Sequence, residues 1–186
     1  INNNYLRSEA NIENLSYIFE ISKFFKIKKK NIIKALTDFK GLNHRHEIFL
    51  KKNNKTFIND SKATSFEASK FALRNNKNIF WVVGGLPKID DKLKLKELKK
   101  NIIKAYIIGN HVKYFKKYLN DHINFKLSNN MQNAVSSIFD DIRKIKRKEL
   151  TVLLSPASAS YDQYKNFEER GNKFKKLVMK YANKNF

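Results

Sequence analysis

Short apolar runs alternate with segments of helical pattern through most of this 186-residue chain. Apolar runs such as IFWVV are typical of strands that are buried on both faces of a mostly parallel sheet. The segments between them place apolar residues three or four positions apart, as a helix packed on a sheet does. The alternation predicts an α/β domain with a Rossmann-like, three-layer arrangement and a mostly parallel sheet of roughly six strands.

Asn53 and Asn54 separate the first two apolar runs and favour a hairpin turn. Thr64 precedes a helical pattern with Glu67 at a capping-box spacing, so we expect a helix to start there. The remaining helices are predicted over 92–100, 111–119, 129–145 and 166–182. Strands are predicted over 47–52, 55–60, 78–85, 105–110, 123–127 and 149–156.

The start of the chain follows a different pattern. Apolar residues recur at helical spacing over 12–25, behind Asn11, a residue type favoured at helix N-caps. A second short helix fits 29–39 and is followed by Gly41, a common stop signal. These segments predict a helical hairpin that precedes the α/β domain, with a boundary within 40–46.

Composition excludes several classes of protein. The chain has no cysteine, which rules out disulfides and thiolate metal sites and fits a reducing compartment. Its four histidines show no zinc-type spacing, and no P-loop or Ser-His-Asp arrangement occurs. No apolar run approaches the roughly 18 residues of a membrane span. We therefore expect a cytoplasmic protein without membrane insertion or a metal site, and the missing initiator Met suggests a fragment.

The net charge of +22 raises the possibility of a nucleic-acid-binding module. Only six of the 39 basic residues are arginine, and the lysines are scattered over every segment rather than grouped with aromatic residues in one patch. Arginine is the residue that reads phosphate and guanine bidentately. The basic module is therefore the weaker alternative, although the charge can attract small anions.

Three strand-to-helix junctions carry unusual residues: NDSKAT at 59–64, GGLPK at 84–88, and SPASASYDQYKNFEERG at 155–171. Ligands of parallel sheets bind at such junctions, and we expect the three loops to meet at one rim around a shared pocket. The first combines a helix N-terminus with Lys62, which suits an anion, and Asp60, which can accept hydrogen bonds from a sugar. A capped helix with a solvated lysine is the competing interpretation.

The other junctions also have a structural alternative. Two glycines before Lys88 let a backbone approach a ligand closely. The small residues at 155–160 suit a backbone wrapped round a small polar substrate, or else a tight structural loop. His44 and Arg45, in GLNHRHE, suit a phosphate or ring contact, and an ordinary surface histidine is the alternative.

Taken in order, GLNHRHE, FINDSKAT, GGLPK and LLSPASASYDQYKNFEERG resemble the C-terminal part of the Mur ligases that add D-glutamate. The resemblance implies that 1–40 is the C-terminal helical end of a central ATPase domain and that 41–186 is the D-glutamate-binding domain. It implies an ATP-dependent acid–D-amino-acid ligase of peptidoglycan synthesis, monomeric, using Mg²⁺. Its substrates would be D-glutamate and UDP-N-acetylmuramoyl-L-alanine, joined through an acyl phosphate. Lacking the P-loop and the UDP-binding domain, this chain alone is expected to be inactive.

The resemblance also implies roles for individual residues. Nucleotide contacts would come from Asn11, His44, Arg45 and Asp60. The active cleft would hold Lys62 and Thr64, and D-glutamate would contact Thr64, Lys88, Ser160, Tyr161 and Phe167. No metal ligand is implied within this chain. The family usually has histidine, proline and cysteine where this chain has Ala10, Asn43 and Ser158.

Three alternatives remain open from the sequence. One is another amide ligase domain of the Mur or folylpolyglutamate type, against which DSKAT discriminates. The second is the basic nucleic-acid-binding module. The third is a domain that has kept the fold and lost the activity.

Overall fold

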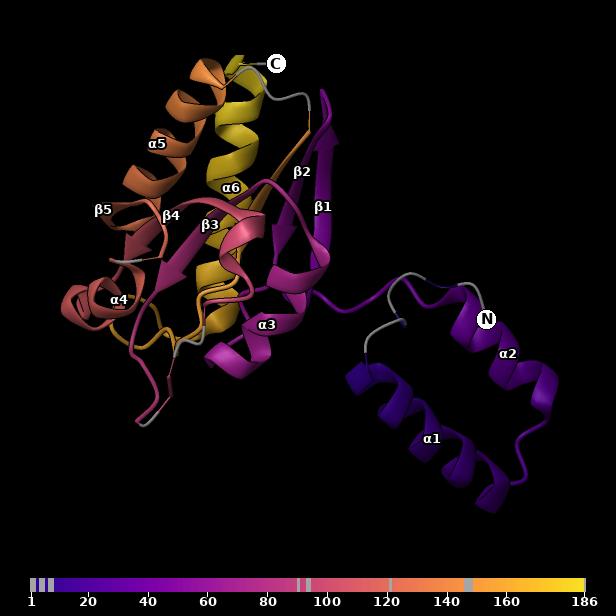
Figure 1. The fold of residues 1–186 in the computed structure, drawn as a ribbon. Helices are drawn as coiled ribbons and strands as arrows, with labels where there is room; N and C mark the ends of the chain where they lie inside the picture. The colour runs from indigo at the N-terminus through magenta and orange to yellow at the C-terminus, as the bar shows by residue number, and fades with distance from the viewer. Residues whose placement is uncertain are drawn as a thin grey trace. The chain divides into compact units, whose positions relative to one another are not determined.

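The computed structural model describes residues 3, 6, 9–89, 91–92, 95–120, 122–145 and 149–185. The chain divides into two compact units, Ile1–Leu42 and Asn43–Phe186. Figure 1 shows the elements of both. No helix among the described residues is long and apolar enough to cross a membrane.

The first unit contains two helices, α1 (Glu9–Phe24) and α2 (Lys29–Asp38). The prediction that Asn11 caps the first helix was wrong, because α1 begins two residues earlier and includes Asn11 in its first turn. The α2 helix ends before Gly41, as predicted. Its last carbonyls are satisfied by Asn3, whose Nδ2 donates to the carbonyl oxygens of Leu36 and Phe39, both at 2.8 Å.

The second unit contains a six-stranded sheet in the order β1-β2-β6-β3-β4-β5. The β1–β2 pair is antiparallel and the other four pairs are parallel, which confirms the predicted mostly parallel sheet. Asn53 and Asn54 both have positive φ, as a tight two-residue hairpin requires. The strands are β1 (Glu47–Lys52), β2 (Lys55–Asn59), β3 (Ile79–Gly84), β4 (Ile102–Ile108), β5 (Phe125–Asn129) and β6 (Leu150–Leu154).

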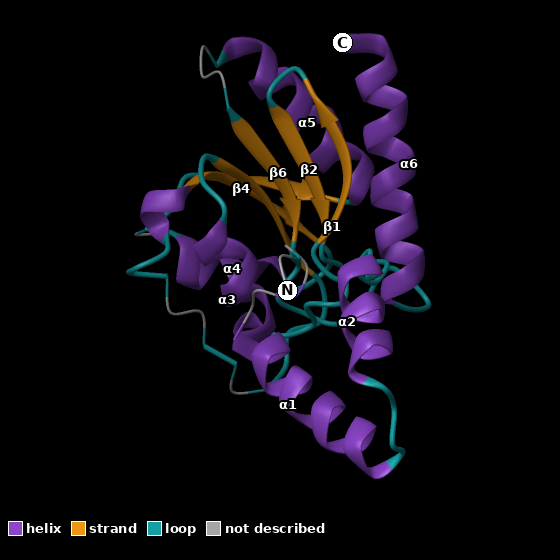
Figure 2. Cartoon of the chain, turned by 90° about the vertical axis from the view of Figure 1, so that its right-hand side faces the viewer, coloured by secondary structure: helices purple, strands orange, loops and turns teal. Residues whose placement is uncertain are grey.

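Helices cover both faces of the sheet, so the predicted three-layer arrangement is correct (Figure 2). Alternate residues of β3 show the two faces: Phe80 and Val82 belong to one core cluster, and Trp81 belongs to the other. The first cluster packs under α5 (Met131–Lys144) and α6 (Phe167–Asn185), and the second under α3 (Phe66–Asn75) and α4 (Val112–Leu119).

Two helix predictions need correction. The α3 helix begins at Phe66 rather than at Thr64, because Ser65 has the extended backbone of an N-cap and accepts from the Ala68 amide at 3.3 Å. The helix predicted over 92–100 is not an α-helix in its described part, and residues 93 and 94 lie outside the described residues. Turns and a short 3-10 helix, η2 (Lys99–Asn101), replace it.

Candidate functional site

The three unusual junctions meet at one rim of the sheet, as predicted. The parallel register pairs Asn59 with Leu154 and Leu154 with Val82, so β2, β6 and β3 end side by side. Beyond the strands, the amide of Gly84 donates to the carbonyl of Pro156 at 3.0 Å. Leu86 and Ala159 then form an isolated antiparallel bridge that joins the second junction to the third.

The two glycines of the second junction have a structural reason within the chain. Gly84 and Gly85 have φ of +126° and +136°. A Cβ at Gly85 would lie 2.3 Å from the carbonyl oxygen of Ala159, and one at Gly84 would lie 2.0 Å from that of Ile108. Neighbouring backbone therefore lies close to Gly84, and both backbone and the Ser158 hydroxyl lie close to Gly85.

Asp60 lies inside the rim rather than on it. Only 7% of the residue is exposed, and its carboxylate accepts from the Ser155 hydroxyl at 2.7 Å and the His46 amide at 3.0 Å. Burial raises the pKa of Asp60 to about 6, against the lowering effect of these hydrogen bonds and of the Arg45 charge. The predicted ribose-binding acid thus also ties the first junction to the third.

Phe167 contacts residues that were predicted to bind the nucleotide and to line the active cleft. Its ring lies 4.4 Å from the Lys62 Nζ, in cation–π geometry, and the ring centroids of Phe167 and His44 are 6.0 Å apart, edge to face. At the start of α6, Phe167, a predicted D-glutamate contact, therefore lies against both His44, a predicted nucleotide contact, and Lys62, a predicted residue of the active cleft.

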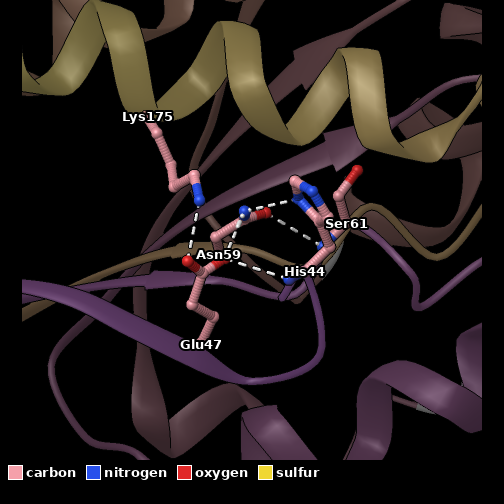
Figure 3. A network of polar contacts seen from close by, with 5 residues as sticks. All are labelled: His44, Glu47, Asn59, Ser61 and Lys175. Carbon is pink, nitrogen blue, oxygen red and sulfur yellow. Dashed lines mark hydrogen bonds and ion pairs between the residues drawn. The ribbon is translucent and has the colours of Figure 1, made fainter. Parts of the chain in front are cut away.

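His44 belongs to a buried polar network that Figure 3 shows. Its Nδ1 lies 2.8 Å from Asn59 Nδ2, and Asn59 Nδ2 also donates to Glu47 at 3.0 Å. The other carboxylate oxygen of Glu47 accepts from Lys175 Nζ at 2.7 Å. Burial, and then the Lys175 charge, lower the pKa of His44 below its ordinary value. The ordinary surface histidine considered above is therefore not what the structure contains.

The other predicted residues differ in exposure. Arg45, Lys62, Thr64, Lys88 and Tyr161 are exposed, which leaves their side chains accessible to a ligand. Ser160 is buried, and its carbonyl accepts from the amides of Gln163 and Tyr164. Asn11 lies in the first unit, in α1.

Arg170 is the main residue of the rim that the sequence analysis missed. It is 1% exposed, and its guanidinium donates to Ser61 Oγ at 3.1 Å, to the Ser61 carbonyl at 2.8 Å and to the Ser158 carbonyl at 3.0 Å. Burial lowers its pKa to about 10. The sequence did contain a signal for its importance, because Arg170 is one of few arginines in the chain and lies at the start of the last helix.

A cavity of about 610 Å³ lies at the opposite end of the sheet, where β2 and β6 begin. None of the predicted site residues lines it. Its walls carry four lysines and several neutral amides but no aromatic ring, so it lacks the stacking surface typical of single-stranded nucleic-acid sites. The described residues contain no group of three or more histidine or acidic side chains that could hold a metal ion.

Comparison with known proteins finds relatives of this chain by sequence, although no family model matches the chain. It is 38% identical over 171 residues to the UDP-N-acetylmuramoylalanine–D-glutamate ligase of Wolbachia sp. subsp. Brugia malayi, covering 92% of this chain and 34% of that protein. The ligase of the same name from Bartonella henselae is 40% identical over 174 residues, covering 94% and 37%.

A solved structure supports the fold. MurF from Acinetobacter baumannii superposes with a TM-score of 0.58 at 14% identity, covering 92% of this chain and 38% of that one. The chain therefore spans little more than a third of the length of the curated relatives it matches.

Proposed function

This chain is a relative of the UDP-N-acetylmuramoylalanine–D-glutamate ligases over more than nine-tenths of its own length, and we propose that it is the C-terminal part of such an enzyme. The enzyme would join D-glutamate to UDP-N-acetylmuramoyl-L-alanine in the cytoplasm during peptidoglycan synthesis, at the expense of ATP. The observation that carries the proposal is the meeting of the three motif-bearing loops at one rim.

The chemistry requires two anions to come together. In the proposed reaction ATP phosphorylates the carboxylate of the UDP-linked substrate, and the amine of D-glutamate then attacks the acyl carbon and displaces phosphate. Fixed cations and amide groups must offset the repulsion between the acyl phosphate and the two carboxylates of D-glutamate. Lys62 and Lys88, both exposed on the rim loops, and the amides at the start of α6 are groups of this kind.

The two ligands would divide these groups between them. We assign Lys88, Ser160, Tyr161 and Phe167, with Thr64, to D-glutamate. We assign His44, Arg45 and Asp60, with Asn11, to the nucleotide. Mg²⁺ would be bound mainly by the central ATPase domain of the proposed enzyme.

Sister amide ligases are the nearest alternative function. The likeness to MurF supports a shared fold and does not choose among substrates. DSKAT, at 60–64, favours the D-glutamate ligases, as does the identity of 38–40% to relatives of that name. We therefore propose D-glutamate as the amino acid.

The assignment of Lys88 can be tested by calorimetry of D-glutamate binding in the full-length enzyme. An ion-paired, hydrogen-bonded carboxylate contributes roughly 1.5–3 kcal/mol, so Lys88→Ala should weaken binding by about 10- to 150-fold. Lys180→Ala, which removes another exposed lysine, on α6, should leave binding unchanged. Equal affinity of wild type and Lys88→Ala for D-glutamate would refute the assignment of Lys88 to D-glutamate binding.

The proposal that this chain is only the C-terminal part of the enzyme gives a second test. Because no P-loop occurs in the sequence, we expect the purified 186-residue chain to release no ADP from ATP in the presence of D-glutamate. A coupled assay for ADP measures this. D-glutamate-dependent ADP release by the purified chain would contradict the proposal.

A further inference from the structure

The main chain of His44 is fixed from both sides. Its amide donates to Glu47 Oε2 at 2.9 Å, and its carbonyl accepts from the Lys62 amide at 3.0 Å. The residue has a φ of +62°, in the left-handed region that few side chains adopt without such support. Only 6% of His44 is exposed, so the ring has little freedom to move.

The hydrogen bonds of Asn59 define which way its amide faces. Its Oδ1 accepts from the Ser61 amide at 3.3 Å, so the other terminal atom is the nitrogen. That nitrogen donates one hydrogen to Glu47 Oε2 at 3.0 Å and the other to His44 Nδ1 at 2.8 Å. An amide nitrogen cannot accept a hydrogen bond, so Nδ1 of His44 must be the acceptor and its proton must be on Nε2.

Burial is the main cause that keeps the His44 ring neutral, and the charges around it act in both directions. Glu47 would favour a charged imidazole, but its Oε1 is ion-paired with Lys175 at 2.7 Å. The charge of Glu168, in α6, also favours the charged form of the ring, whereas that of Lys175 opposes it. Gly171, in the same helix, leaves space for the ring, because a Cβ there would lie 2.3 Å from His44 Nδ1.

We propose that Asn59 is a positioning residue that holds His44 as a neutral imidazole protonated on Nε2, and that Glu47 and Lys175 orient the Asn59 amide. The Nε2 atom has no hydrogen-bond partner among the described residues. His44 would therefore meet its ligand as a neutral N–H donor, suited to a hydroxyl or carbonyl-type acceptor rather than to a full phosphate charge. That the ligand is a nucleotide rests on the proposed function.

Nitrogen-15 NMR of the imidazole side chains in the 186-residue chain tests the proposal. At neutral pH, His44 should show an unprotonated Nδ1 and a protonated Nε2, with the exposed His111 and His122 as references in the same spectrum. In Asn59→Asp, a carboxylate replaces the amide donor, and the proton should move onto Nδ1. Asn75→Asp, the same change at the exposed end of α3, should leave His44 unaltered.

Two results would overturn the proposal: a protonated Nδ1 in the wild type, or no change of ring protonation in a folded Asn59→Asp variant. Should that variant fail to fold, the wild-type spectrum alone still decides. Adding an adenine nucleotide to the full-length enzyme, which has the P-loop that this chain lacks, separates this proposal from the proposed function. Suppose that His44 is protonated on Nε2 and that its Nε2 signal does not change when the nucleotide is added. That result would support the positioning role of Asn59 and refute the assignment of His44 to the nucleotide.

Discussion

At the scale of single residues, Asp60 shows how burial makes a carboxylate costly. Its pKa of about 6 lies above the ordinary value of 3.8. Between these two pH values the carboxyl of Asp60 keeps its proton in the folded state and has lost it in the unfolded chain. The stabilising effect of that proton is full below pH 4 and is lost as pH rises through 6. We expect Asp60→Asn to be more stable than wild type at pH 8, by up to about 3 kcal/mol, and to lose this advantage near pH 4.

Urea unfolding of both proteins at several pH values measures the effect. Asp140→Asn, at a half-exposed acid on α5, is a control that should show no such difference. A difference between wild type and Asp60→Asn that does not change between pH 4 and pH 8 would contradict the buried, raised carboxyl.

Residue identities alone predicted which loops form the rim but not how their side chains point. Lys62 and Lys88 are exposed, as a ligand-binding lysine must be, because charged side chains usually remain in water. Asn59 and Arg170 point inward, and a sequence does not reveal orientation for polar groups whose partners come from distant segments. Arg170, for example, bonds to Ser61, 109 residues away.

At the scale of elements, Arg170 joins the β2–α3 loop to the β6–α6 loop. Arg170→Met would keep the length of the side chain but leave buried acceptors on Ser61 and Ser158 without donors. We expect a loss of about 1–3 kcal/mol in the free energy of unfolding. Hydrogen exchange of the loop amides should also accelerate.

Arg74→Met is the matched control, because Arg74 is exposed and its ion pair with Glu97 is long, at 3.8 Å. Exposed pairs of this kind contribute between zero and about 1 kcal/mol. Equal denaturant midpoints for Arg170→Met and Arg74→Met would show that the buried guanidinium does not hold the loops.

Gly171→Ala tests the packing of α6 against the polar network. An alanine normally stabilises a helix interior by roughly 1 kcal/mol relative to glycine. Here the new methyl would meet His44 Nδ1 and both terminal atoms of Asn59, so we expect a net loss of about 1–2 kcal/mol. Asn172→Ala, on the exposed side of the same turn, should be neutral or slightly stabilising by thermal unfolding. A stabilised Gly171→Ala would argue against the contact.

The central strands were predictable because their apolar runs are buried on both faces. β3, for example, is buried throughout, whereas the edge strands β1 and β5 are only partly buried. Helix ends and short helices were less predictable. Leu95 and Leu98 have helical spacing and are buried, yet a turn followed by a 3-10 helix satisfies that spacing as well as an α-helix does. Ser65 and Thr64 are equally suitable caps by type, and only the backbone conformation distinguishes them.

At the scale of the whole molecule, nearly all of the apolar core belongs to the second unit. Both core clusters consist of residues between Phe49 and Ala182, whereas α1 exposes large side chains such as Phe24 at 81%. We expect residues 43–186 alone to unfold cooperatively, with a Tm within a few degrees of the full chain. Circular dichroism on heating checks this, and a broad, non-cooperative transition would contradict it.

The strand order was not predictable from periodicity, although the fold class was. Buried parallel strands all present similar apolar runs, so the sequence pattern does not say which strand lies beside which. Placing β6 between β2 and β3 depends on packing between segments that are far apart in the chain.

The position of β6 has a consequence for biosynthesis. As the chain leaves the ribosome, β2 and β3 emerge some 70 to 100 residues before the strand that separates them. Until β6 arrives, both offer unpaired apolar edges to any neighbouring nascent chain, and long-range parallel pairing forms slowly. Chaperone protection during translation would therefore matter most in the interval between the synthesis of β3 and that of β6.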